Sequence, residues 1–184
     1  MSNADASMII DTTRLILRPH RVEDFDRYAA LLAEREPLVP YALPAHSRED
    51  AWARLLRFIG HWVHFGYGLF VAEERASGLI VAEIGLAHFQ RAVDPECEGM
   101  PEAAWRVSQR ARRGGVGIEA MQAALSWFDR DVRSERTFCL IHPENAASLR
   151  VAARLGYREI SRGRYKDEPV ISLQREREAS IVHG

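Results

Sequence analysis

Residues 112–121 read Arg112-Arg113-Gly114-Gly115-Val116-Gly117-Ile118-Glu119-Ala120-Met121, and they join a short apolar segment to a long amphipathic one. Glycines lack the Cβ atom that keeps a ligand away from the backbone, and they accept positive φ angles. The N-terminus of a helix presents unpaired N–H groups and the positive end of the helix dipole. Two guanidinium groups beside it add charge and fork-shaped hydrogen-bond donors. This stretch therefore predicts a phosphate-binding turn at the start of a helix.

The hydrophobic pattern on either side predicts one α/β domain over residues 12–174, with flexible termini at 1–11 and 175–184. Strands outnumber helices at both ends of the chain, which favours a mixed sheet (α+β) over a regular βαβ winding. Residues 36–47 carry three prolines and predict a loop, after which Ser47 is a candidate N-cap. We expect strands at 14–18, 69–72, 79–86, 103–107, 137–141, 157–161 and 170–173, and helices at 22–32, 48–65, 116–128 and 145–155.

Composition excludes several classes of protein. The chain has 184 residues and a formal net charge of −1, which gives no support to a nucleic-acid or membrane surface. No apolar stretch approaches the roughly 18 residues of a membrane span, and the first residues lack the pattern of a signal peptide. The cysteines Cys97 and Cys139 lie far apart and form no metal-ligand spacing. We therefore expect a cytoplasmic protein without metal, nucleic-acid or membrane partners, either a monomer or a homodimer.

A second informative segment begins at His142 and ends at Tyr157. Asn145 stands where a predicted strand gives way to a helix, and Ser148 lies on the first turn of that helix. An asparagine in this position either caps its helix or contacts a ligand, and the residues alone leave both interpretations open.

The glycine-rich turn also matches a dinucleotide fingerprint, Gly115-x-Gly117-x-x-Ala120. Two features speak against a dinucleotide-binding oxidoreductase domain. Residues 108–113 separate the strand from the glycines, whereas a dinucleotide fold turns at once from strand to loop. In addition, the strand that ends at Ile141 is followed by His142 and Pro143, with no acidic residue to hold a ribose.

The two segments together resemble the Gcn5-related N-acetyltransferase (GNAT) family, and most closely its ribosomal-protein N-terminal acetyltransferase branch (RimJ/RimL-like). Arg112-x-x-Gly115-x-Gly117 is similar to the family's acyl-coenzyme A motif. Asn145-x-x-Ser148 with Leu155-Gly156-Tyr157 resembles the second motif of the branch. The opening segment 13–19, with Asp24 after it, resembles its first strand and turn.

The resemblance implies the GNAT fold, with about seven strands, four helices and a sheet splayed between the fourth and fifth strands. It also implies that acetyl-coenzyme A is the cosubstrate. The pyrophosphate would rest on residues 112–117, and the pantetheine arm would pair with the fourth strand. Asn145 would bind the pantetheine, and Ser148 would lie near the thioester sulfur. The implied binding residues are Trp105, Arg106, Val107, Arg112, Arg113, Gly114, Gly115, Val116, Gly117, Asn145 and Ser148.

The implied reaction is direct attack of an amine, which must be neutral to attack. An α-amino group of pKa about 7.7–8.0 requires roughly 1 kcal/mol for deprotonation at pH 7, whereas a lysine side chain requires roughly 4.6 kcal/mol. A backbone N–H near Val107 would hold the oxyanion, and Ser148 would assist the leaving thiol. Glu102 is the first candidate for the base and Glu83 the second. For each, a structural salt bridge is the alternative.

These features predict an N-acetyltransferase that acts on a primary amine, of a protein N-terminus or of a small molecule. Two alternatives are a non-catalytic acyl-coenzyme A sensor on the same fold and the dinucleotide-binding domain. His61 and His64 lie three residues apart on a predicted helix, but no third metal ligand is near them in the sequence.

Overall fold

The computed structural model describes residues 8–34, 46–92 and 94–177. The predicted proline-rich loop lies outside the described residues except for its last two. Ser47 caps its helix as expected: its hydroxyl oxygen accepts a hydrogen bond from the Asp50 N–H, and the Asp50 side chain bonds back in a capping box. The elements are β1 (Ile10–Asp11), β2 (Leu15–Arg18), η1 (Val22–Asp24), α1 (Phe25–Ala33), α2 (Arg48–Phe65), β3 (Leu69–Glu74), β4 (Ile80–Ala87), η2 (Pro95–Cys97), β5 (Glu102–Val107), η3 (Gln109–Ala111), α3 (Val116–Asp131), β6 (Arg136–Ile141), α4 (Ala146–Arg154), β7 (Arg158–Tyr165) and β8 (Glu168–Glu176).

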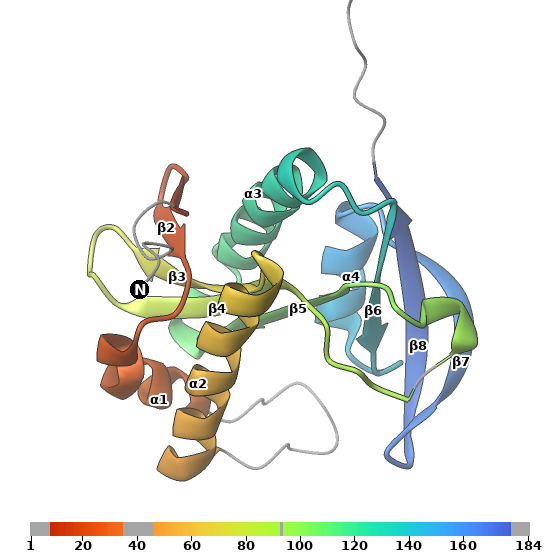
Figure 1. Ribbon diagram of the computed structural model, residues 1–184, viewed down its shortest axis with the longest axis horizontal. Coiled ribbons are helices and arrows are strands. Elements are labelled where there is room, and N and C mark those ends of the chain that lie inside the picture. Colours follow the sequence, from red (N-terminus) through yellow and green to blue (C-terminus); the bar gives the residue numbers. More distant parts are fainter. Residues whose placement is uncertain (1–7, 35–45, 93, 178–184) are drawn as a thin grey trace, which may run out of the picture.

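The strands form one mixed sheet in the order β1-β2-β3-β4-β5-β6-β8-β7. Strands β1 to β5 pair antiparallel, as do β6, β8 and β7. The two halves meet where β5 and β6 run parallel, and their ladder pairs Glu102 with Phe138. Beyond that pair β6 turns steeply away from β5 (Figure 1). This mixed, splayed sheet confirms the predicted fold class. It excludes the doubly wound dinucleotide fold, whose strands are mostly parallel.

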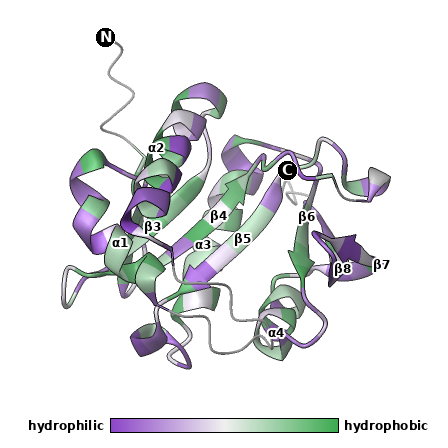
Figure 2. Ribbon diagram, turned by 90° about the horizontal axis from the view of Figure 1, so that it is seen from below, coloured by the Kyte–Doolittle hydropathy of each residue, from purple (hydrophilic) through white to green (hydrophobic). Residues whose placement is uncertain are grey.

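Helices cover both faces of the sheet (Figures 1 and 2). On one face α1 and α2 bury Tyr28, Leu32 and Leu55 against Val71 of β3. On the other face α3 packs its residues Ala120, Met121, Ala124 and Phe128 into the largest core cluster, together with α4 and the inward-facing residues of β2 to β6. The site residues of β5 therefore lie between two packed layers.

The ordered structure extends beyond the predicted elements at both ends. The two-residue strand β1 pairs with β2, and β8 continues to Glu176, past the predicted end at Leu173. Arg175 is buried there and forms an ion pair with Asp129 of α3, at 2.5 Å between Nη2 and Oδ2. The sequence predicted a frayed tail from Gln174 because its charges suggested solvent exposure. That prediction was wrong for residues 174–176, because Arg175 is held by Asp129 on α3, a helix distant in the sequence.

Helix α2 corrects a second expectation. Helical periodicity places its apolar residues 52, 55, 56, 59 and 63 on one stripe, which predicts that they share one environment. The structure buries Ala51, Leu55 and Phe58 instead, while Trp52, Leu56 and Val63 are exposed. The helix carries apolar residues on two faces, and hydrophobic periodicity alone does not tell which face packs on the sheet. Among the described residues, no helix has the length and apolarity that crossing a membrane requires.

Candidate active site

The candidate site is built around the free side of β5. The Ser108 N–H donates to the Val81 carbonyl at 2.8 Å, so Ser108 belongs to a hydrogen-bonded pair of the β4–β5 ladder. In an antiparallel ladder such pairs alternate with pairs whose backbone groups point away. The N–H and C=O groups of Trp105 and Val107 therefore point away from β4, toward the opening that the divergence of β6 creates. A sheet thus presents an unpaired edge inside a domain, where it can pair with an extended ligand.

The glycine-rich turn closes one end of this opening. Gly115 is the N-cap of α3 with φ of 76°, in the left-handed region that favours glycine, and it forms no side-chain cap. Arg113 also has a positive φ of 67°. The first N–H groups of α3 have no intrahelical acceptor, so the turn offers the kind of backbone donors that an anion can accept from. Gly117 lets this helix approach β5 closely, because a Cβ on it would lie 3.0 Å from Val107 Cγ2.

A carboxylate from α3 ties this turn to the N-terminal strand. Glu119 Oε1 accepts hydrogen bonds from the Thr12 hydroxyl at 2.6 Å and from the Arg14 N–H at 3.0 Å. The Arg14 guanidinium bonds Glu119 Oε2 through Nε at 2.7 Å and the Gly114 carbonyl through Nη1 at 2.6 Å. Arg14 thus holds the turn in place through an ion pair with Glu119 and a hydrogen bond to Gly114. Sequence reasoning missed it, since its partners lie about a hundred residues away and no spacing reveals them.

The arginines near the turn separate into different environments. Arg112 Nε donates to the Val107 carbonyl at 3.1 Å, which joins the turn to β5. Arg113 is exposed, and Arg110 forms an ion pair with Glu74. Arg106 lies on the other face of the sheet, where its guanidinium donates to the Glu34 carbonyl at 2.7 Å. Successive side chains of a strand point to opposite faces, so the sequence cluster of four arginines does not form one patch.

Asn145 and Ser148 lie across the opening from β5. The Asn145 side chain caps α4, because its Oδ1 accepts the Ser148 N–H at 3.0 Å. The Ser148 hydroxyl oxygen lies 3.3 Å from Trp105 Nε1, which donates to it. Both side chains are half-buried. The structure therefore brings Trp105, Asn145 and Ser148 together, and it confirms that Asn145 caps its helix.

Glu102 lies at the closed end of the opening, where β5 pairs with β6. It is only 4% exposed, and its Oε2 lies 2.9 Å from Arg91 Nε. Burial outweighs the attraction of the Arg91 charge and raises the pKa of the carboxyl to about 7. The carboxyl lines a cavity of about 250 Å³ with His88, Phe89 and Phe138 among its other walls. A buried carboxyl with a pKa near neutrality has the properties of a general base.

Glu83 has a different environment on β4. It is 1% exposed, and its Oε1 accepts hydrogen bonds from Tyr28 and, at 3.1 Å, from His20. Its Oε2 forms an ion pair with Arg54 of α2 at 2.6 Å. Burial alone would raise the pKa of Glu83, but the charge of Arg54 and the hydrogen bond from His20 outweigh it and hold the pKa well below its usual range. A carboxylate held in this way is a weak base, and the arrangement has the form of the structural ion pair that the sequence left open.

The two carboxylates and Arg106 share the face of the sheet that α1 and α2 cover, because Glu83 is the register partner of Arg106 and Glu102 lies four residues earlier on β5. Trp105 and Val107 point to the α3 face instead. The signal of the half-buried Arg54 in the sequence was its position on the same face of α2 as Phe58 and His61, an unusual place for a charge.

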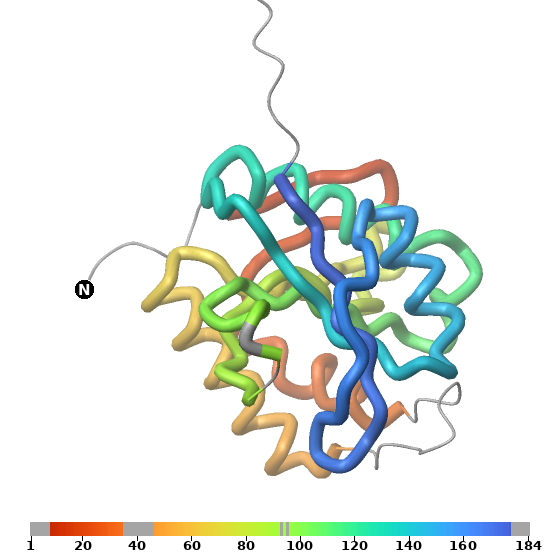
Figure 3. Tube along the Cα trace, turned by 90° about the vertical axis from the view of Figure 1, so that its right-hand side faces the viewer, coloured from red at the N-terminus to blue at the C-terminus, as the bar shows by residue number. Residues whose placement is uncertain are grey.

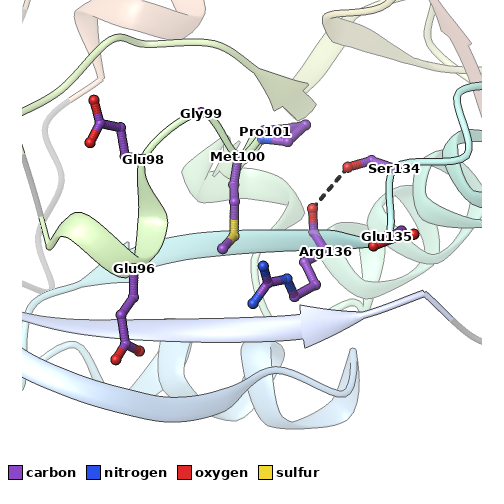
Figure 4. Close-up of a pocket in the computed structure, with 8 residues that line it drawn as sticks. All are labelled: Glu96, Glu98, Gly99, Met100, Pro101, Ser134, Glu135 and Arg136. Carbon is purple, nitrogen blue, oxygen red and sulfur yellow. Dashed lines mark hydrogen bonds between the residues drawn. The ribbon is translucent and has the colours of Figure 1, made fainter.

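A second, larger cavity of about 770 Å³ lies between the β4–β5 connection and the turn before β6 (Figure 4). Its walls include Glu96, Glu98, Met100, Glu135 and Arg136, and none of the predicted site residues. Among the described residues, no group of three or more His, Cys, Asp or Glu side chains is arranged to hold a metal ion.

Comparisons with known proteins agree with this geometry. A sequence model of the acetyltransferase (GNAT) domain matches residues 14–158. Among solved structures, a GNAT-family acetyltransferase from Bordetella pertussis is 31% identical, with a TM-score of 0.82 over 92% of this chain and 99% of that chain.

Two structures with lower identity share the fold. The ribosomal-protein-S5-alanine acetyltransferase from Vibrio fischeri is 16% identical, with a TM-score of 0.73 over 94% of this chain and 98% of that one. RimL, a ribosomal L7/L12 α-N-protein acetyltransferase in complex with coenzyme A, is 15% identical, with a TM-score of 0.71 over 92% of this chain and 98% of that one.

Proposed function

The chain belongs to the GNAT family of acetyltransferases, and we propose that it transfers the acetyl group of acetyl-coenzyme A to a primary amine, that of a protein N-terminus or of a small molecule. The observation that carries this proposal is the unpaired edge of β5 beside the uncapped start of α3. Coenzyme A has an extended arm that ends in phosphates. The backbone groups of β5 can pair with the amides of such an arm, and the start of α3 can bind its phosphate charge.

The residues present fit acetyl-coenzyme A. Gly115 has no Cβ to obstruct a phosphate, and the first turn of α3 offers backbone N–H donors. Arg112 and Arg113 supply positive charge around the turn. The N–H and C=O groups of Trp105 and the N–H of Val107 would provide donors and an acceptor for the arm, and Asn145 would face them from the N-cap of α4. Since Arg106 points to the opposite face, we leave it out of the proposed binding residues.

Acetyl-coenzyme A supplies an acetyl group already activated as a thioester. Glu102 would take the proton that the acceptor ammonium must lose, since its pKa of about 7 lets it exist as a base near neutral pH. The N–H of Val107 would donate to the carbonyl oxygen as negative charge develops there. Ser148 accepts the Trp105 N–H and keeps its own proton, which it can donate to the departing sulfur. Glu83 would hold the α2 side of the site in place through Arg54.

Energetics favour an acceptor of low pKa. An α-amino group needs about 1 kcal/mol for deprotonation at pH 7, and one carboxylate of matched pKa supplies this readily. A lysine side chain, at roughly 4.6 kcal/mol, would require a stronger base than the described residues offer near Trp105. The name of RimL, a ribosomal L7/L12 α-N-protein acetyltransferase, supports a protein N-terminus as one acceptor class.

The test measures thiol release from acetyl-coenzyme A in the presence of a panel of amines. Peptides with free N-termini, the same peptides with blocked N-termini and a single lysine, and small primary amines form its three arms. The proposal expects release that depends on the amine and is greatest for α-amino groups or small amines of low pKa. Tight binding of acetyl-coenzyme A without any amine-dependent release would contradict it and would indicate a binding protein on this fold.

A further inference from the structure

Helix α2 presents an apolar surface to solvent along its outer side. Trp52 is 39% exposed, Leu56 43% and Val63 77%. Figure 3 shows α2, in yellow and orange, along one edge of the molecule. Scattered exposed apolar residues are normal, but an apolar stripe along one helix indicates a surface that packs on something.

The stripe has an internal regularity. At 100° per residue, Glu49, Leu56 and Val63 lie along its middle line. Trp52 and the half-buried Ile59, which also packs on the core beneath α2, form one flank, and Ala53 and Gly60 form the other. A Cβ on Gly60 would meet nothing within 4 Å, so the space beside it is open. The stripe therefore has a bulky flank and a small flank, each made of two residues seven positions apart.

We propose that this stripe is a docking surface for a second copy of the chain, with the two α2 helices antiparallel and the twofold axis passing at Leu56. In such a pair residue i of one copy meets residue j of the other, and j meets i. Leu56 then packs on Leu56, Trp52 packs beside Ile59, and Ala53 packs beside Gly60. The small flank lets the two helices approach closely, while the bulky flank fills the space on the other side.

Charge complementarity supports this occupant. The first turn of α2 carries Glu49 and Asp50, and its last turn carries His64. In the antiparallel arrangement Glu49 of one copy lies near Val63 and His64 of the other. The antiparallel orientation of the two helix dipoles also stabilises the pair. A helix of 18 residues is about 27 Å long, so this contact is smaller than a standard interface. We therefore expect a weak dimer whose formation depends on protein concentration.

The first experiment is sedimentation velocity of the full chain over a range of concentrations. The wild-type protein should change from monomer to dimer as concentration rises. Leu56→Glu should raise the dissociation constant by at least about tenfold, because it would bury an unpaired carboxylate at the twofold axis. Leu79→Glu is the matched control, since Leu79 is equally exposed, at 43%, and lies outside α2. It should dimerise as the wild type does.

A second variant separates an effect on dimerisation from an effect on folding. Val63 is largely exposed, so Val63→Glu leaves the packed core untouched while placing two carboxylates near each other across the interface. Circular dichroism checks that both variants keep the fold. Dimerisation should weaken in both.

Oxidative crosslinking tests the orientation. Leu56→Cys should form a covalent dimer, and Leu79→Cys should not. Glu49→Cys alone should not crosslink, whereas mixing it with Val63→Cys should give a heterodimer. A monomer throughout the concentration range, a dimer that Leu56→Glu leaves unchanged, or efficient crosslinking of Glu49→Cys to itself would overturn the proposal.

Discussion

Trp105 of β5 and Ser148 of α4 touch across the opening in the sheet, with 3.3 Å between the indole Nε1 and the hydroxyl oxygen. The two residues come from elements that the splay holds apart, and their contact spans the channel that the arm of acetyl-coenzyme A would follow. The fluorescence of Trp105 should therefore be sensitive to changes at Ser148, and the Trp105 N–H orients the Ser148 hydroxyl group.

Ser148→Ala should lower the acetyl-transfer rate by about tenfold or less, because a thiol of pKa near 8.5 leaves without much help. The intrinsic fluorescence of the protein should change as well, since Trp105 loses its acceptor. Asn145→Ala is the comparison: it removes the helix cap and should cost about 1 kcal/mol of unfolding free energy. A Ser148→Ala loss of a thousandfold would mean that the hydroxyl does more than assist the leaving group.

Glu102→Gln should lower kcat/KM by about 10²–10⁴-fold at pH 8, where the wild-type carboxyl is ionised. As pH increases toward 7, the ratio of the wild-type rate to the variant rate should increase about tenfold per pH unit, because Glu102 becomes ionised, and above pH 7 the ratio should level off. The titration of the acceptor amine affects both proteins equally and cancels in the ratio. Rates measured between pH 5.5 and 9 with one amine test this. A ratio independent of pH would exclude Glu102 as the base.

Glu83→Gln should destabilise the protein by about 3 kcal/mol at pH 7, because it leaves the Arg54 charge without its buried partner. Urea denaturation measures this difference. The pKa of Glu83 is lowered in the folded state, so the stability it contributes is present above its ordinary value of 4.5 and is lost as pH falls through the folded-state pKa. The difference between wild type and variant should therefore shrink in acid.

The control for that prediction is Glu159→Gln. Glu159 also pairs with an arginine, Arg162 at 2.6 Å, but both side chains are exposed. An exposed pair is screened by solvent, so this variant should unfold at the same urea concentration as the wild type. Equal losses in the two variants would mean that burial does not decide the strength of the Glu83 pair.

Gly115→Val should weaken acetyl-coenzyme A binding by at least about tenfold, since a β-branched residue at a φ of 76° strains the turn and intrudes on the phosphate position. Isothermal titration calorimetry measures the affinity. Gly163→Val in β7 serves as the control, because a Cβ there meets nothing within 4 Å and its φ is not in the left-handed region. Unchanged affinity in Gly115→Val would remove the turn from the binding site.

Local signals in the sequence predicted most of the elements. The Ser47 capping box and the glycine-rich turn act over a few residues, so they could be read directly. The short strand β1 was missed, because two residues carry no periodicity. The extended β8 was missed because its last charged residues are stabilised by Asp129, which lies 46 positions earlier than Arg175.

The sequence by itself determined the order of all strands and helices after β1 and the glycine-rich start of α3 at Gly115, since these depend on backbone conformation and neighbouring side chains. Only the tertiary structure decided which charges are paired and which faces are covered. Glu83 acquires its low pKa from His20 and Arg54, and Glu102 acquires its high one from burial beside Arg91. Both effects depend on desolvation and on charges brought close by the fold, and neither is encoded in local spacing.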